Sequence, residues 1–358
     1  MTTTDHRHSQ QQDSKGRNIH MTAVSDITSE DDRGRARLRS LELCAGAGGQ
    51  ALGLESAGFD PVLLIDNKDY AVETLRMNRP SWDVREMELA GFDPAEDQRA
   101  YDVDLLSAGL PRVQASADRK RSRGSATELA VLRDTVLLMH GVQPRALLIE
   151  NVPELVTKDM YQDARTDVEA ELEHLGYGFR WLVINAADYG VPQDRKMGVL
   201  VAFKNKCADS FEVPPIQDSQ PTVGSALFES MASRGWEQAA EWAGQADRLA
   251  PTLVGGSEDR GGPDLGPRGS KRLWAAMGVN GGSIADVPPG AGFRWDPNAG
   301  TESMIKLTVG QTALIQGFPK DWRFAGGKTK QCRQIGNALP PPVAHVLGQA
   351  IRGVLEEH

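Results

Sequence analysis

Short apolar runs alternate with stretches of helical spacing along residues 38–204. In order, the runs read LRSLELC, PVLLID, VDLLSAG, RALLIEN, FRWLVINAADYGV and KMGVLVAFK. Apolar runs separated by helical segments are typical of strands that helices cover on both faces. The pattern therefore predicts an α/β fold with a mostly parallel, doubly wound sheet. Ligands of such sheets bind beyond the carboxyl ends of the strands.

The pattern changes on both sides of this core. Residues 1–37 hold many charges and few large apolar side chains, which predicts a disordered tail. Residues 205–300 are rich in Gly, Pro, Ser and Trp and lack a sustained period, so we expect a smaller, loop-rich region there. Residues 301–358 return to helical spacing, and we expect them to pack back on the core.

Composition narrows the class of protein. No stretch approaches the ~18 consecutive apolar residues of a membrane helix, and the start of the chain lacks the apolar core of a secretion signal. We therefore expect a cytoplasmic protein that does not engage a membrane. Three cysteines at wide spacing fit neither a disulfide framework nor a zinc site, and we expect no metal. The net charge of −9 argues against indiscriminate binding to polyanions.

A glycine turn, CAGAGG at 44–49, lies between the first expected strand and a helix. Glycines in this context let the backbone approach a ligand closely. Asp66 ends the next expected strand, about 20 residues on, where a carboxylate can accept hydrogen bonds from ribose hydroxyls. The pair favours a nucleotide-like cofactor, while a helix cap or a solvated loop charge is the alternative for Asp66.

Further segments keep the order of one family's motifs. LCAGAGGQALGLESAGF is followed by IENV at 149–152, YGVPQDR at 189–195, and then QGFPKDW and RQIGNALPPPVA within 316–344. In content and order they resemble the DNA (cytosine-5) methyltransferases, over residues 38–353. The resemblance implies a Rossmann-like methyltransferase core that binds S-adenosylmethionine. It also implies a target-recognition-like region within residues 205–300 and DNA as a partner.

The resemblance assigns the cofactor side of the core. It places Asp66 on the ribose, Glu88 near the adenine, and the GNALPPP segment beside the methionine end. Cys44 stands where the family usually has Phe. The implied cofactor residues are Cys44, Ala45, Gly46, Gly48, Gly49, Asp66, Glu88, Asn337 and Ala338.

The family's chemistry adds a cysteine thiolate to cytosine carbon 6 while a glutamic acid donates toward ring nitrogen 3. That cysteine lies in a pattern like AGxPCQxFS, and AGLPRVQAS here puts Arg112 at its position. A guanidinium has no free lone pair with which to attack carbon 6. Met197 likewise replaces the second arginine of a QxRxR pattern. The implied catalytic positions are Arg112, Glu150, Asn151 and Arg195, with a purely structural role as the alternative for Glu150.

These departures shape the expected function. We expect a homologue that binds S-adenosylmethionine and DNA but does not methylate cytosine carbon 5. Such a pseudoenzyme would act as a regulator, or as the partner of an active methyltransferase or of a restriction enzyme, and would be nucleoid-associated if it binds DNA. The alternative is an active methyltransferase with a different acceptor. The third hypothesis is ordinary carbon-5 methylation through a relocated nucleophile, Ser116 or Cys332.

Basic residues gather where the family's active-site loop closes over DNA. Residues 112–124 hold five basic residues against one acid, enough to neutralise several phosphates. A solvated loop is the alternative. The candidate DNA contacts are Arg119, Lys120, Arg121 and Arg123 in this loop and Lys271 and Arg272 in the glycine-rich region.

Overall fold

The computed structural model describes residues 36–113, 122–217, 220–255 and 262–358, with only the backbone described for 122–125. The tail expected at 1–37 therefore lies almost wholly outside the described residues. Within the described ranges, no helix is both long enough and apolar enough to span a membrane.

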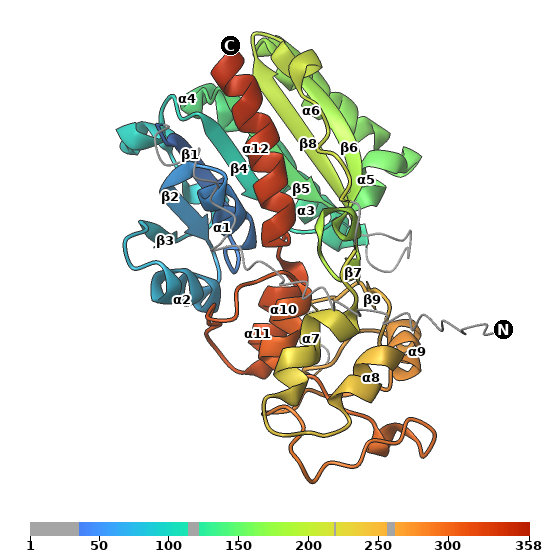
Figure 1. Cartoon of the computed structure of the whole chain (residues 1–358). Coiled ribbons are helices and arrows are strands. Elements are labelled where there is room, and N and C mark those ends of the chain that lie inside the picture. Colours follow the sequence, from blue (N-terminus) through green and yellow to red (C-terminus); the bar gives the residue numbers. More distant parts are fainter. Residues whose placement is uncertain (1–35, 114–121, 218–219, 256–261) are drawn as a thin grey trace, which may run out of the picture.

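Seven strands form one sheet in the order β3-β2-β1-β4-β5-β8-β6 (Figure 1). The strands are β1 (Leu38–Leu43), β2 (Phe59–Asp66), β3 (Val84–Glu86), β4 (Leu105–Gly109), β5 (Ala146–Asn151), β6 (Tyr177–Asn185) and β8 (Lys196–Lys204). Strand β8 pairs antiparallel with both β5 and β6, whereas β3, β2, β1, β4 and β5 pair in parallel. The predicted fold class is confirmed.

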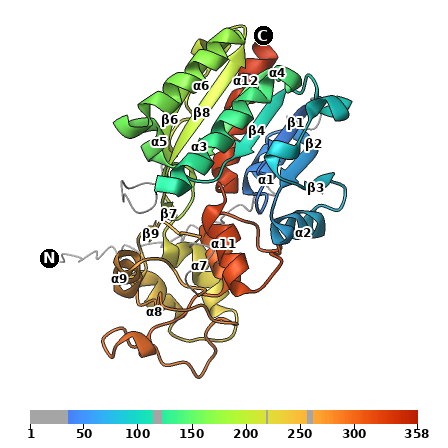
Figure 2. The same ribbon diagram turned by 180° about the vertical axis from the view of Figure 1, so that it is seen from behind.

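Helices cover both faces of this sheet. The face seen in Figure 1 carries α1 (Gly49–Ser56) and α12 (Pro341–Glu357), which pack on the strands through Leu54 and Leu347. The opposite face, in front in Figure 2, carries α3 (Ser122–Leu137) and α6 (Gln162–His174). The other helices of this part are α2 (Asp69–Asn78), α4 (Met139–Val142) and α5 (Pro153–Thr157). Because both faces are covered, consecutive residues are buried in a central strand such as β5, in which all six residues are buried.

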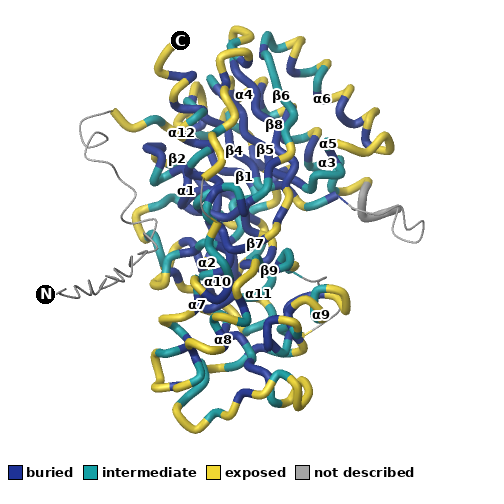
Figure 3. Tube along the Cα trace, turned by 45° about the vertical axis from the view of Figure 1, so that its right-hand side comes forward, coloured by how far each residue is buried: buried dark blue, intermediate teal, exposed yellow. Residues whose placement is uncertain are grey.

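A second apolar core lies below the sheet in the view of Figure 1. Its helices are α7 (Val223–Ala232), α8 (Ala239–Gln245), α9 (Arg268–Ala276), α10 (Val309–Ile315) and α11 (Lys328–Asn337), and a small sheet joins β7 (Gln193–Asp194) to β9 (Ala250–Pro251). Trp242 and Trp274 are wholly buried in its centre, which Figure 3 shows as a dark interior. Large aromatic side chains supply much apolar area per residue, so a core can form here without a long periodic sequence.

Candidate active site

A cavity of about 650 Å³ opens where β1, β2, β4 and β5 end. Strands β2 and β4 lie on opposite sides of β1, so the sheet's strand order reverses here, and open α/β sheets bind ligands at such a point. The helix α11 and the segment after it complete the wall. Of the residues predicted from sequence, those lining it are Cys44, Ala45, Gly46, Gly49, Asp66, Glu88, Arg112, Glu150, Asn337 and Ala338.

The glycine turn forms one end of the cavity. Gly46 has a φ of 55°, a left-handed conformation that glycine adopts without strain, and a Cβ built on it would meet nothing within 4 Å. The space over its backbone is thus open for a ligand. Gly49 starts α1, and a Cβ there would lie 2.3 Å from the Leu339 carbonyl oxygen. One glycine therefore leaves room for a ligand and the other lets the chain after α11 approach.

Asp66 closes the turn from the end of β2. Its Oδ2 accepts a hydrogen bond from the Gly46 amide at 2.8 Å, and its Oδ1 accepts one from the Lys68 amide at 2.9 Å. Burial raises the pKa of this carboxyl, against the lowering effect of the two amides. Glu88 is held beside it by Asn67, whose Nδ2 donates to Glu88 Oε2 at 3.0 Å. Two carboxylates thus stand at one end of the cavity.

These features fit S-adenosylmethionine. The molecule is a cation at its sulfonium and carries ribose hydroxyls and an adenine amine, all of which acidic groups can bind. The open space over Gly46 and the acids Asp66 and Glu88 meet those needs. A cavity of this size also lies in the range for cofactor sites.

The thiol of Cys44 lines the same cavity. Burial, with the nearby Asp66 and Glu88, raises its pKa to about 12. The neutral thiol is therefore the dominant form at physiological pH.

A buried polar chain forms the floor of the cavity, and the sequence analysis missed it. Ser40 Oγ donates to Glu42 Oε1 at 2.8 Å, and Gln50 Nε2 donates to Ser107 Oγ at 2.5 Å. Ser107 also bonds to Glu42, whose register partner it is between β1 and β4. Burial raises the pKa of Glu42 to about 7. The only signal in the sequence was an acid inside the apolar run LRSLELC.

Arg112 and Glu150 face each other at the opposite end of the cavity. Arg112 Nη2 lies 3.3 Å from Glu150 Oε1 and donates to the Asn337 carbonyl oxygen at 3.4 Å. The Glu150 side chain is 3% exposed and the Arg112 side chain 26%. Burial raises the pKa of Glu150, while the positive charges of Arg112 and Arg195 lower it.

Asn151 fixes the segment that carries Arg112. Its Oδ1 accepts a hydrogen bond from the Val113 amide at 3.1 Å, and its Nδ2 donates to the Pro111 carbonyl oxygen at 3.2 Å. Asn151 does not line the cavity. It ties residues 111–113 to the end of β5 and so sets the position of Arg112.

Arg195 is wholly buried behind the cavity. Its guanidinium donates to the carbonyl oxygens of Leu253 and Gly336, both at 2.9 Å, and so joins the chain before β8 to the second core and to α11. Burial and the charge of Arg112 lower its pKa well below the usual value. Met197 does not line the cavity either; it is 1% exposed in β8 and packs among the apolar residues of the sheet.

Among the other predicted residues that the structure describes, Gly48, Lys271, Arg272 and Cys332 do not line this cavity. Ser116, Arg119, Lys120 and Arg121 fall outside the described residues, and Arg123 is described only as part of α3. Lys271 makes a 2.7 Å ion pair with Asp264, and Arg272 is exposed on the same helix, α9. Burial raises the pKa of the Cys332 thiol to about 11. The described ranges contain no cluster of His, Cys, Asp and Glu that could hold a metal.

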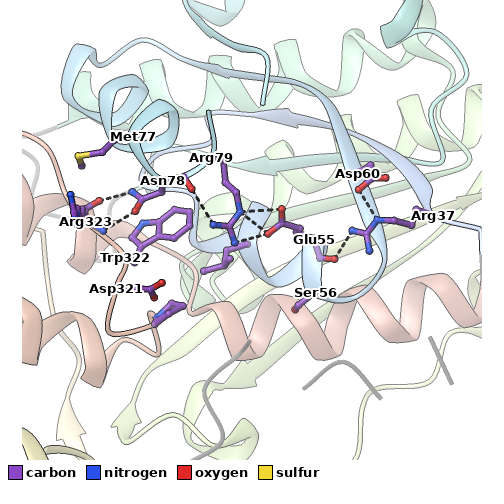
Figure 4. Close-up of a pocket in the computed structure, with 12 residues that line it drawn as sticks. Arg37, Glu55, Ser56, Asp60, Met77, Asn78, Arg79, Asp321, Trp322 and Arg323 are labelled. Atoms are coloured by element: carbon purple, nitrogen blue, oxygen red, sulfur yellow. Dashed lines mark hydrogen bonds and ion pairs between the residues drawn. The ribbon is translucent and has the colours of Figure 1, made fainter. Parts of the chain in front are cut away.

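The residues around a second pocket hold the glycine turn in place (Figure 4). The Trp322 indole Nε1 donates to the Ala47 carbonyl oxygen, within the turn, at 3.1 Å. Arg79 lies over the Trp322 ring, 5.3 Å from its centre, and donates to both carboxylate oxygens of Glu55. Asn78 bonds in both directions to the backbone of Arg323. The segment before α11 is thereby joined to α1, α2 and the turn.

Fold, cavity and comparison together assign the chain to a family. It belongs to the C-5 cytosine-specific DNA methylases, whose family model matches residues 38–353.

Its relatives include the type II methyltransferase M.NaeI of Lentzea aerocolonigenes, 42% identical over 89% of this chain and 75% of the relative. Another is the type II methyltransferase M.NgoMIV of Neisseria gonorrhoeae, 39% identical over 89% of this chain and 98% of the relative. A crystal structure of a prophage-encoded DNA modification methyltransferase from E. coli superposes with a TM-score of 0.60, at 19% identity over 89% of this chain and 99% of that one.

The comparisons correct the expected function. We expected a homologue that does not methylate cytosine carbon 5, or a methyltransferase with another acceptor. The match of residues 38–353 to the C-5 cytosine-specific family, with 42% identity to a type II methyltransferase along 89% of the chain, contradicts both. The expectation was wrong because it gave residue 112 more weight than the similarity along the rest of the chain. The expected cofactor, S-adenosylmethionine, is confirmed by the family.

Proposed function

We propose that this chain is a modification methyltransferase that transfers the methyl group of S-adenosylmethionine to carbon 5 of cytosine in DNA. One observation carries the proposal: in a chain 42% identical to a type II methyltransferase, the glycine turn and the buried Glu150 share one cavity. A cofactor held over Gly46 and a base held at Glu150 would therefore meet in the same space. A methyltransferase needs this proximity because the methyl group moves directly between its two ligands.

We assign the cofactor end by the chemistry of its groups. Asp66 would accept from the ribose hydroxyls, Glu88 would accept from the adenine amine, and Asn337 and Ala338 would border the methionine end. When bound, the cofactor supplies a methyl group on a sulfonium, which is an electrophile. At the opposite end Glu150 would face ring nitrogen 3 of the cytosine and donate a proton to it.

We place Arg112 at the position that the nucleophile takes in the family. Addition to carbon 6 requires a lone pair, which the guanidinium lacks. The raised pKa values of Cys44, about 12, and Cys332, about 11, also keep both thiols protonated. The proposal therefore requires a nucleophile other than residue 112, and this requirement determines the test.

DNA is the proposed partner, and a restriction enzyme of the same specificity is the proposed functional counterpart, because the relatives are named type II methyltransferases. We assign DNA contact to residues 205–300, which contribute α7, α8 and α9 to the second core, and within them to the exposed Arg272 of α9. Arg195 would keep that region aligned with the active site through its bonds to Leu253 and Gly336.

Covalent trapping tests the proposal. DNA with 5-fluorocytosine cannot release its carbon-5 substituent as a proton, so an enzyme that has added to carbon 6 and methylated carbon 5 stays attached. The purified chain with S-adenosylmethionine should form such a complex, and peptide mass spectrometry would identify the attached residue. Glu150→Gln should abolish the complex, whereas Glu173→Gln, on the exposed side of α6, should leave it unchanged. Failure of the wild-type chain to form a complex while it binds both ligands would overturn the proposal.

A further inference from the structure

We infer that Arg112 is a positioning residue: a displaceable counter-ion that covers Glu150 in the free protein and gives it up when a base enters the cavity. The inference rests on the proposed function for the identity of the entering group, a cytosine. The contacts of the Arg112 side chain with Glu150 and Asn337 account for an arginine at position 112.

Arg112 bridges two parts of the wall. Its Nη2 reaches Glu150 Oε1, at the end of β5, and the Asn337 carbonyl oxygen, at the end of α11. Both partners line the cavity, so the guanidinium lies across the space between them. A base that is to reach Glu150 must take the place of this group.

The contacts of Arg112 are easy to break. At 3.3 and 3.4 Å they are longer than the usual range of about 2.7–3.2 Å for an N–H···O bond. A quarter of the side chain is already exposed, so water can solvate the charge when it leaves. Asn151 ties residues 111–113 to β5, and its two hydrogen bonds hold the backbone of this segment rather than the guanidinium.

Arg195, the other cation facing Glu150, cannot play this part. Its guanidinium is wholly buried and bonded to two backbone carbonyls. Glu150 therefore has one fixed cation, Arg195, and one displaceable cation, Arg112. Among the described residues, these are the two groups whose positive charges lower the pKa of its carboxyl.

The departure of Arg112 changes the protonation of Glu150. A buried carboxylate that loses an opposite charge is left poorly compensated, and it takes up a proton instead. The proton comes from solvent and binds a carboxylate oxygen that Arg112 had faced. Glu150 then carries the hydrogen that ring nitrogen 3 of a cytosine can accept. Base entry and formation of the acid are thereby coupled in one exchange.

A titration of Glu150 tests this without any methyl transfer. In the free full-length protein, the carboxyl resonance of ¹³C-labelled glutamate, assigned with Glu150→Gln, should titrate about one pH unit or more higher in Arg112→Gln than in wild type. Arg112→Lys keeps a cation and should titrate close to wild type. Arg133→Gln removes an arginine that pairs with Asp167, on the surface between α3 and α6, and serves as the matched control.

Duplex DNA should then raise the Glu150 titration in wild type and leave that of Arg112→Gln nearly unchanged. An Arg112→Gln carboxyl that titrates as in wild type, in a protein with native circular dichroism, would refute the inference. So would a wild-type titration that DNA binding does not move. Because these readouts need no turnover, they can succeed or fail independently of the trapping experiment.

Discussion

Arg112 Nη2 and Glu150 Oε1 lie 3.3 Å apart at one end of a cavity whose other end is the glycine turn. The pair joins residues 38 positions apart in the sequence, one in the segment after β4 and one in β5. Its location makes residue 112 the position at which the chemistry of the site can be changed most directly.

Arg112→Cys should speed carbon-5 methylation. The substitution removes the counter-ion of Glu150, which favours its acid form, and places a thiol at the family's nucleophile position. We expect the rate of 5-methylcytosine formation to rise by roughly tenfold or more, since acid–base assistance alone contributes about 10²–10⁴. Single-turnover assays with radiolabelled cofactor measure it. Arg112→Ser, which supplies a weaker nucleophile, is the control, and equal rates for both variants would contradict the prediction.

Gly46→Ala should impair cofactor binding beyond its effect on stability. The left-handed backbone costs alanine about 1 kcal/mol, and the added methyl group projects into the open space over the turn. Gly176→Ala is the matched control, because Gly176 is also left-handed, with φ 82° and no atom within 4 Å, but lies outside the cavity. Calorimetry should find weakened S-adenosylmethionine binding only in Gly46→Ala. Equal affinities in the two variants would count against the assigned cofactor site.

Trp322→Phe should lower the affinity for S-adenosylmethionine, although Trp322 does not line the cofactor cavity. The variant keeps an aromatic ring beside Arg79 but loses the hydrogen bond to Ala47, worth about 1 kcal/mol, or roughly fivefold in Kd. Trp82→Phe is the control, since Trp82 also lies beside Arg79, 5.7 Å away, without a bond to the turn. Fluorescence-detected cofactor binding would show the difference. A wild-type Kd for Trp322→Phe would mean that the indole does not position the turn.

Glu42→Gln should remove a pH dependence of stability. The folded-state pKa of Glu42, about 7, exceeds its ordinary value of 4.5, so the folded protein prefers the protonated acid. That contribution is fully present below about pH 4.5 and is lost as the pH rises through 7, a change of about 3 kcal/mol. Urea unfolding of both proteins from pH 5 to 8 should show a smaller decline in the variant. If the free energy of unfolding declined equally with pH in both proteins, a group other than Glu42 would be responsible for the decline.

Much of the site follows from local sequence signals. The glycine turn, Asp66 and Glu150 each stand at the end of an apolar run, and parallel strands bring such ends to one edge of a sheet. Residues that act through their immediate sequence context could therefore be predicted without coordinates.

The rest depends on long-range register and packing. The polar chain under the cavity arises because Glu42 pairs with Ser107 across β1 and β4, a register that the sequence does not state. The second apolar core, with its tryptophans, has no periodic sequence pattern from which it could be predicted. The functional prediction was wrong because the departures at residues 112 and 197 were given more weight than the similarity along the rest of the chain. The contacts of Arg112 with Glu150 and Asn337 appear only in the folded chain.

The most direct test of the proposed function is nucleoside analysis of duplex DNA incubated with the purified wild-type chain and S-adenosylmethionine. We predict that liquid chromatography and mass spectrometry will detect 5-methyl-2′-deoxycytidine, and that Glu150→Gln will abolish it. Unmodified DNA from a preparation that binds the cofactor, or a methyl group found only on the exocyclic nitrogen, would contradict carbon-5 methylation.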